Sequence, residues 1–239
     1  MDIFKDNNLY PKYNNSVIKH YANCFNTVYV GLNPFYKVNN YSLKGSIPED
    51  EIILENGHII YWKEIIKNTS LKDFRDVNKA LITSIGGLKK NDERQDLLKI
   101  LNEYTIKNDI WDPSEGMFEI FTKKNIFDVL NFNKITYVTI KDEHYENQKE
   151  LNLAETSFKE FANSIDTNDF FIYSKNREIL FSIDWDYFFF FIAFDYNNID
   201  KLNIETNFEG FYANETTTHS WAWDKEIKAK KINFWKRFF

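Results

Sequence analysis

The run of apolar residues at positions 187–194 constrains the fold of this chain more than any other feature. It holds about eight consecutive aromatic or aliphatic side chains. A membrane-spanning helix needs about 20 such residues, so the run is too short to be a membrane anchor. A short, continuous apolar run is typical of a buried strand. We therefore expect a buried strand here.

Three further segments in the second half of the chain have the composition of strands. Residues 170–173 and 179–183 flank a polar turn and therefore predict a β-hairpin. Residues 208–213 predict another strand. Successive strands without intervening helices are typical of antiparallel sheets, and we expect such a sheet in this part of the chain.

The first half of the chain has mainly helical periodicity. We expect Ser70 to cap one helix, with Asp73 at the capping-box position, and the glycine pair at 86–87 to end it. A second helix follows, so that the two predict a helical hairpin. The apolar faces of the pair consist of Leu71, Phe74, Val77, Leu81 and Ile85, and of Leu97, Leu98, Leu101 and Tyr104.

These patterns together predict the α+β fold class, in which a helical N-terminal half packs on a mainly antiparallel C-terminal sheet. The helix-rich part spans residues 1–165 and the strand-rich part spans residues 166–239. No repeat, no low-complexity tract and no linker rich in proline or glycine separates them. The simplest organisation is a single domain over residues 1–239.

The charge and the cysteine content restrict the partners and the compartment. The net charge of -6 argues against a nucleic-acid surface, because binding to a phosphate backbone needs clustered lysine and arginine. An acidic chain more often binds a basic protein or a small molecule, and we expect a protein partner. Cys24 is the only cysteine, which excludes internal disulfides and cysteine-rich zinc sites. Residues 1–13 lack the apolar core of a secretion signal, so we expect a cytoplasmic protein. The sequence does not specify its oligomeric state.

The common catalytic motifs are missing from the sequence. The seven glycines do not have the spacing of a dinucleotide fingerprint, a phosphate-binding loop or a nucleophile elbow. The four histidines are too far apart for a local metal pair. Any catalytic centre must therefore be assembled by the fold, and we expect no cofactor.

Two carboxylates flank a tryptophan immediately after the predicted hairpin. In an extended chain Asp184 and Asp186 project to the same side, and Mg²⁺ or Mn²⁺ takes oxygen ligands from such a pair. The element resembles the Asp-x-Asp motif at strand ends of some glycosyltransferases, which implies a metal site. A turn whose acids face water gives the same sequence. Trp185, between them, is a candidate binding residue.

A second candidate constellation lies around His219. Histidine is the side chain best suited to proton transfer near neutral pH, and Glu209 or Glu215 is a candidate to orient it. Trp221 and Trp223 would form one wall of a cleft and are candidate binding residues. A threonine-rich turn between two aromatic strands, with the histidine hydrogen-bonded at its edge, is the structural alternative.

The last fifteen residues form a basic segment. Residues 225–239 hold six basic residues and one acidic residue. An aromatic stripe along one helical face would suit a membrane surface or a partner groove. Docking of that stripe on the domain's own core explains the pattern equally well, and we do not expect membrane attachment.

Several short motifs follow one another along the chain. They are Trp62-Lys63, Ile85-Gly86-Gly87-Leu88, Arg94 with Asp96-Leu97, Pro113-Ser114-Glu115 and Asp184-Trp185-Asp186. Their order resembles a bacterial family of unknown function found in low-GC Gram-positive species. The resemblance implies a cytoplasmic protein without an assigned activity and supplies no catalytic residues. The second half is also similar in style to immunity proteins that protect bacteria from polymorphic toxins.

Two functions follow from these patterns. The first is a non-enzymatic intracellular binding protein that acts through an acidic and aromatic surface, and an immunity-type protein is one form of it. The alternative is a metal-dependent enzyme, using Mg²⁺ or Mn²⁺, whose cleft combines Asp184, Asp186 and His219.

Overall fold

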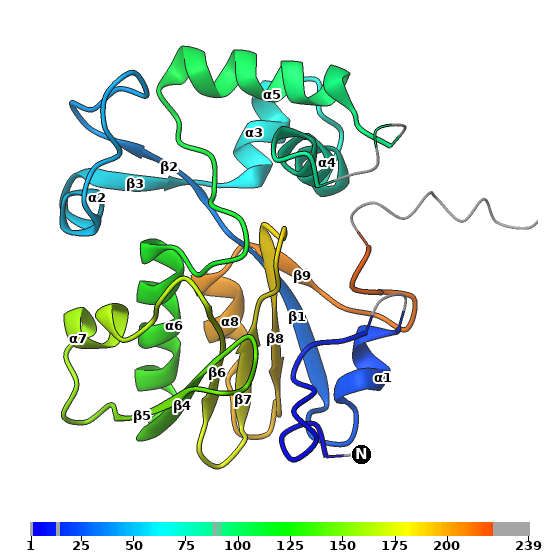
Figure 1. The fold of residues 1–239 in the computed structure, drawn as a ribbon, viewed down its shortest axis with the longest axis vertical. Coiled ribbons are helices and arrows are strands. Elements are labelled where there is room, and N and C mark those ends of the chain that lie inside the picture. The colour runs from blue at the N-terminus through cyan, green and yellow to red at the C-terminus, as the bar shows by residue number, and fades with distance from the viewer. Residues whose placement is uncertain (1, 13–14, 88–89, 91, 222–239) are drawn as a thin grey trace, which may run out of the picture.

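The computed structural model describes residues 2–12, 15–87, 90 and 92–221, and its centre is an antiparallel sheet of seven strands (Figure 1). The strand order is β5-β4-β6-β7-β8-β1-β9, and every neighbouring pair is antiparallel. The strands are β1 (Thr27–Leu32), β4 (Tyr137–Asp142), β5 (Gln148–Asn152), β6 (Asp169–Ser174), β7 (Ile179–Ser182), β8 (Phe189–Phe194) and β9 (Gly210–Tyr212). The short β9 is therefore one edge of the sheet.

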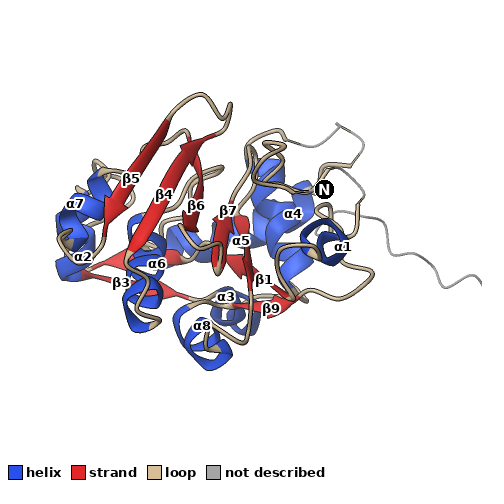
Figure 2. Cartoon of the chain, turned by 90° about the horizontal axis from the view of Figure 1, so that it is seen from below, coloured by secondary structure: helices blue, strands red, loops and turns tan. Residues whose placement is uncertain are grey.

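Four helices accompany this sheet. Helix α6 lies between α7 and α8, while α1 packs beside β1 (Figures 1 and 2). Their bounds are α1 (Val17–Tyr21), α6 (Ile120–Phe132), α7 (Phe158–Asn163) and α8 (Lys201–Asn207).

A second group of elements lies beyond one end of the sheet, at the top of Figure 1. The chain leaves β1 and enters β2 after only two residues, and β2 pairs with β3 in a separate two-stranded ribbon. Buried residues of this group, such as Trp62 and Val77, belong to the same hydrophobic cluster as the sheet. The elements are β2 (Phe35–Val38), α2 (Asp50–Asn56), β3 (Gly57–Ile60), α3 (Trp62–Asn68), α4 (Phe74–Ser84) and α5 (Gln95–Asn108).

Strand β8 confirms the buried strand predicted from the apolar run. All six of its residues are buried, because β7 and β1 flank it and side chains cover both faces of the sheet. A strand buried on both faces needs no polar positions, which explains why the run does not alternate.

The α+β fold class and the predicted hairpin are confirmed by the structure. Strands β6 and β7 form the hairpin, with Phe171 opposite Ser182. The sheet also takes strands from the helix-rich part of the sequence, because β1, β4 and β5 all precede residue 166.

Two local predictions were wrong. Helix α4 is capped by Asp73 rather than Ser70, because the Asp73 carboxylate accepts hydrogen bonds from the amides of Arg75 and Asp76 at 2.9 and 3.1 Å. The strand expected over residues 187–194 begins only at Phe189. The preceding residues form a turn, in which Asp186 has a φ of 60°.

Candidate functional site

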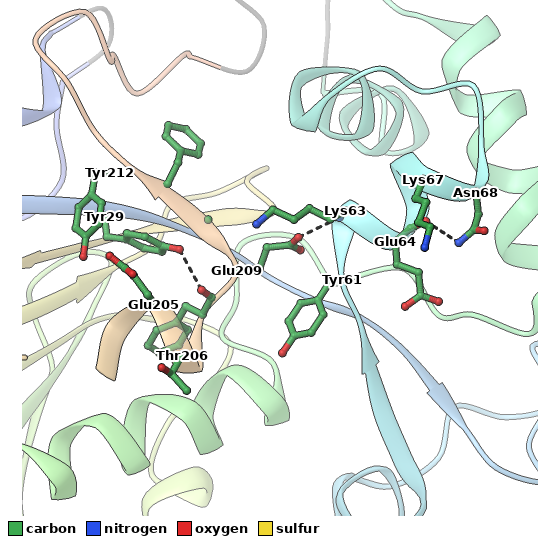
Figure 3. A pocket seen from close by; sticks show the side chains of 13 residues that line it. Tyr29, Tyr61, Lys63, Glu64, Lys67, Asn68, Glu205, Thr206, Glu209 and Tyr212 are labelled. Carbon is green, nitrogen blue, oxygen red and sulfur yellow. Dashed lines mark hydrogen bonds between the residues drawn. The ribbon is translucent and has the colours of Figure 1, made fainter. Parts of the chain in front are cut away.

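A cleft of about 980 Å³ opens between α3 on one side and α8 and β9 on the other (Figure 3). We call it the α3–β9 cleft. Its lining combines aromatic rings with charges of both signs. The lining residues are Tyr29, Tyr61, Lys63, Glu64, Lys67, Asn68, Glu205, Thr206, Phe208, Glu209, Gly210, Phe211 and Tyr212.

Glu209 joins the two walls of the cleft. Its carboxylate accepts hydrogen bonds from the backbone amides of Trp62 and Lys63, at 2.5 and 3.0 Å. Figure 3 shows the bond to Lys63. These are the first two amides of α3, which have no partner inside the helix. Burial raises the pKa of Glu209, and the two amides and the Lys63 ammonium act in the opposite direction. Glu209 therefore works as an N-cap supplied from a distant part of the chain.

A buried polar network fixes α3 to the end of β1. The Trp62 indole donates to the backbone carbonyl of Asn33 at 2.7 Å, and both residues are fully buried. The Asn33 side chain donates to the carbonyl of Met117 at 2.9 Å and accepts from the Thr122 hydroxyl at 2.9 Å. Buried polar groups that are satisfied in this way specify a single arrangement. The network holds α3, α6 and the end of β1 in fixed positions around the cleft.

Two tyrosines and a glutamate form the end of the cleft next to β1. The rings of Tyr29 and Tyr212 meet edge to face, with centroids 5.1 Å apart. The Tyr29 hydroxyl donates to the carbonyl of Phe208 at 3.0 Å. Burial, helped by the nearby carboxylate of Glu205, raises the pKa of Tyr29 to about 12 and raises that of Tyr212 as well. The two hydroxyls therefore stay protonated at physiological pH.

Four charged side chains in the cleft are exposed to solvent. Lys63 and Lys67 project from α3, together with Glu64, and Glu205 projects from α8 (Figure 3). Among the residues that the structure describes, none places an opposite charge within 4.0 Å of these four. The charges are thus available to a ligand.

The predicted metal pair lies outside this cleft. Asp184 is half-buried and accepts a hydrogen bond from the amide of Trp185 at 2.9 Å, while Asp186 is exposed. Burial is the main cause that raises the pKa of Asp184, and Asp186 adds to it. Trp185 is 57% exposed, with one edge against Phe170. Within the described parts of the chain, no group of three or more His, Cys, Asp or Glu residues is placed to hold a metal ion.

His219 is buried, and its Nε2 lies 3.1 Å from the hydroxyl of Tyr187. Tyr187 follows Asp184 by three residues in the sequence. The two glutamates expected to orient His219 lie elsewhere, because Glu209 caps α3 and Glu215 is exposed in a turn. The catalytic and metal roles of these residues stay predictions.

Of the two tryptophans predicted to form a cleft wall, only Trp221 lies among the described residues. Trp221 is buried, with its ring against Phe189 and Phe211 at centroid distances of 5.2 and 5.0 Å. It supports the cleft residue Phe211 from behind. Trp223 and the basic segment 225–239 lie outside the described residues. No helix in the described ranges is both long enough and apolar enough to cross a membrane.

Of the residues that line the cleft, only Glu209 was among the candidate site residues predicted from the sequence. Lys63 and Lys67 belong to a helix of seven residues, which Tyr61 directly precedes, and Glu205 belongs to another helix of the same length. The two helices are brought together only by long-range contacts. The motif Trp62-Lys63, used above for its resemblance to a family, was the one signal at this position.

Comparison with known proteins defines the class to which the chain belongs. Residues 13–223 match the family described as "Protein of unknown function (DUF2711)", so the chain is a member of that family, and the predicted resemblance is confirmed. The match includes every residue that lines the α3–β9 cleft.

One relative is the "Uncharacterized protein YwbB" of Bacillus subtilis (strain 168). It is 26% identical over 175 residues, which cover 73% of this chain and 76% of the relative. No solved structure matches the chain.

Proposed function

We propose that this chain is a non-enzymatic, cytoplasmic binding protein that holds a segment of a protein partner in the α3–β9 cleft. One observation carries the proposal. The cleft presents aromatic rings together with four exposed charged side chains that form no ion pair with a described residue. The half-buried carboxylate of Glu209, in contrast, already accepts hydrogen bonds from two backbone amides. Aromatic residues in a surface depression are typical anchors of protein interfaces.

The exposure of the lining favours a protein segment over a small molecule. Pockets for small molecules have volumes of about 300–1,000 Å³ and bury most of the ligand. The α3–β9 cleft reaches the upper end of that range, with a volume of about 980 Å³, but Tyr61, Lys63, Lys67 and Glu205 are all exposed at its rim. An immunity protein, which blocks a toxin by binding it, is one member of the class proposed here.

The test is photo-crosslinking from inside the cleft. Tyr61 lines the cleft and is 44% exposed, and Tyr137 on β4, which is not among the lining residues, is also 44% exposed. Each is replaced in turn by benzoylphenylalanine in the full chain, expressed in its native host. We expect a discrete adduct with one protein, identified by mass spectrometry, from position 61 and none from position 137. Equal crosslinking at both positions, or none at position 61, would refute the proposal.

A further inference from the structure

The free edge of the seven-stranded sheet lies inside the α3–β9 cleft. Among the described residues, strand β9 pairs with β1 alone, so its other side carries no described strand. Residues of β9 and of α3 line the cleft together. An unpaired strand edge presents a row of backbone donors and acceptors and is a template for a further strand. The cleft therefore offers backbone groups in addition to side chains.

The register shows which backbone groups point outward. The Leu32 amide donates to the Glu209 carbonyl, and the Ala213 amide donates to the Val28 carbonyl, both at 2.9 Å. Because hydrogen-bonded and non-hydrogen-bonded pairs alternate along an antiparallel ladder, Gly210 and Tyr212 occupy non-hydrogen-bonded positions opposite β1. Their N–H and C=O groups thus point away from the sheet. No described residue forms a hydrogen bond with them.

The walls of the cleft determine what can reach this edge. Helix α3 stands opposite β9, held by the Glu209 cap and by the Trp62–Asn33 hydrogen bond. A folded second copy would have to bring a whole sheet edge into a space that α3 closes on one side. A single extended peptide is narrow enough, since neighbouring strands lie about 4.8 Å apart.

Charge indicates the chemistry of the peptide. Glu205 is exposed beside Tyr29 and Tyr212, and no described cation lies within 4.0 Å of it. The ammonium of Lys201 already lies over the Tyr212 ring, 5.4 Å from its centroid, so a lysine or arginine of the peptide would find the Glu205 carboxylate and the ring of Tyr29 at this end of the cleft. The net charge of -6 of the whole chain favours the approach of a basic segment.

From these observations we infer that β9 binds its partner by strand addition. An extended peptide pairs with the outward N–H and C=O groups of Gly210 and Tyr212 and places a basic side chain at Glu205. The inference rests on the proposed function, because it describes how the same cleft holds its partner. The backbone supplies sequence-independent hydrogen bonds, and the side-chain contacts supply the selectivity.

The first experiment measures amide hydrogen exchange in the free full chain by NMR, at low and at high protein concentration. We expect the amides of Gly210 and Tyr212 to exchange fast at both concentrations, while the Phe211 amide, which points toward β1, is protected. Protection of Gly210 and Tyr212 at low concentration would mean that a segment of this chain already covers the edge. Protection only at high concentration would mean that a second copy covers it. Either result overturns the inference.

The second experiment selects ligands from a phage-displayed library of random dodecapeptides. We expect peptides rich in lysine or arginine, whose binding protects the amides of Gly210 and Tyr212. The Tyr212→Pro variant removes an outward N–H but no bond to β1, and should weaken binding by about tenfold or more, which corresponds to at least about 1.4 kcal/mol. Tyr212→Ala removes the ring but keeps the N–H and is the matched control. Its loss of affinity should be clearly smaller.

The outcomes separate this inference from the proposed function. Selection of no peptide, or equal binding by Tyr212→Pro and Tyr212→Ala, overturns strand addition. If Tyr212→Pro does not fold, exchange in the wild-type complex decides, because unprotected amides at Gly210 and Tyr212 refute the pairing. A specific crosslink from position 61 together with such unprotected amides would leave the binding function in place and reject only its mode.

Discussion

Replacing Glu119 by glutamine is expected to stabilise the protein at pH 8 far more than at pH 5. Glu119 directly precedes α6 and is only 9% exposed. Its carboxyl accepts a hydrogen bond from the Ser114 amide, and the carboxylates of Asp50 and Asp112 lie near enough to repel a negative charge. Burial is the largest cause and raises the pKa of Glu119 to about 7. Burial also raises the pKa of Asp112, to about 6, but this residue is unchanged in the variant.

The direction in which the free energy of unfolding changes with pH follows from the order of the two pKa values. The pKa of the Glu119 carboxyl is near the ordinary glutamate value of 4.5 in the unfolded chain and about 7 in the folded chain. Both states are protonated at low pH, so the free energy of unfolding is highest there and falls as the pH rises from about 4.5 to about 7. A difference of about 2.5 pKa units corresponds to about 3 kcal/mol above pH 7. At pH 5 the loss is only about 1 kcal/mol.

Urea unfolding of both proteins at the two pH values measures the effect. Glutamine keeps the carbonyl oxygen that accepts from Ser114 but cannot ionise, so Glu119→Gln should gain about 2 kcal/mol over the wild type between pH 5 and pH 8. Other carboxyl groups cancel, because both proteins contain them. Glu155→Gln, the same change at an exposed residue, is the control and should show no such gain. A constant difference between Glu119→Gln and the wild type would refute the reasoning.

Three further changes test other parts of the structure. Gly210→Ala should lower the free energy of unfolding in urea by at least about 2 kcal/mol, because its Cβ would lie 1.9 Å from a carbonyl oxygen of β1. Gly45→Ala is the control and should change little, because its Cβ would meet no atom closer than 3.4 Å. Equal effects of the two changes would contradict the close packing at Gly210. Glu209→Ala should lower the free energy of unfolding by about 1–2 kcal/mol, because it removes the cap of α3. Glu205→Ala removes no cap and should lower it less. The reverse order would exclude a capping role for Glu209. If the predicted metal site exists, Mn²⁺ should raise the melting temperature of the wild type but not that of Asp184→Asn. An unchanged melting temperature in both proteins would refute the metal site.

The fold class could be predicted because local patterns agree with the tertiary structure over long stretches. The apolar run became β8, and the segments around 170–183 became a hairpin whose strands are close in sequence. Strand β1 was missed, although five of its six residues are buried. Its partners are β8 and β9, more than 150 residues away. Pairing over such a separation leaves no periodic signal in the sequence.

The candidate site was harder to predict for a related reason. Glu209 was selected as a partner for His219, because the two are close in sequence and have suitable chemistry. In the structure its carboxylate turns to the start of α3, where two amides are free. Local chemistry identified a residue with an unusual role, but it could not identify the distant helix that decides that role.

The position of Glu209 also explains how a small number of contacts defines the cleft. One side chain follows α8 and precedes β9, and it holds α3 by two hydrogen bonds across 147 and 146 residues of sequence. On the other side, the Trp62 indole fixes α3 to the end of β1 through Asn33. Both walls are therefore tied to β9, at one edge of the sheet, and to its neighbour β1. Because the free backbone groups of β9 lie between these ties, the open strand edge and the side chains around it form a single, pre-organised surface.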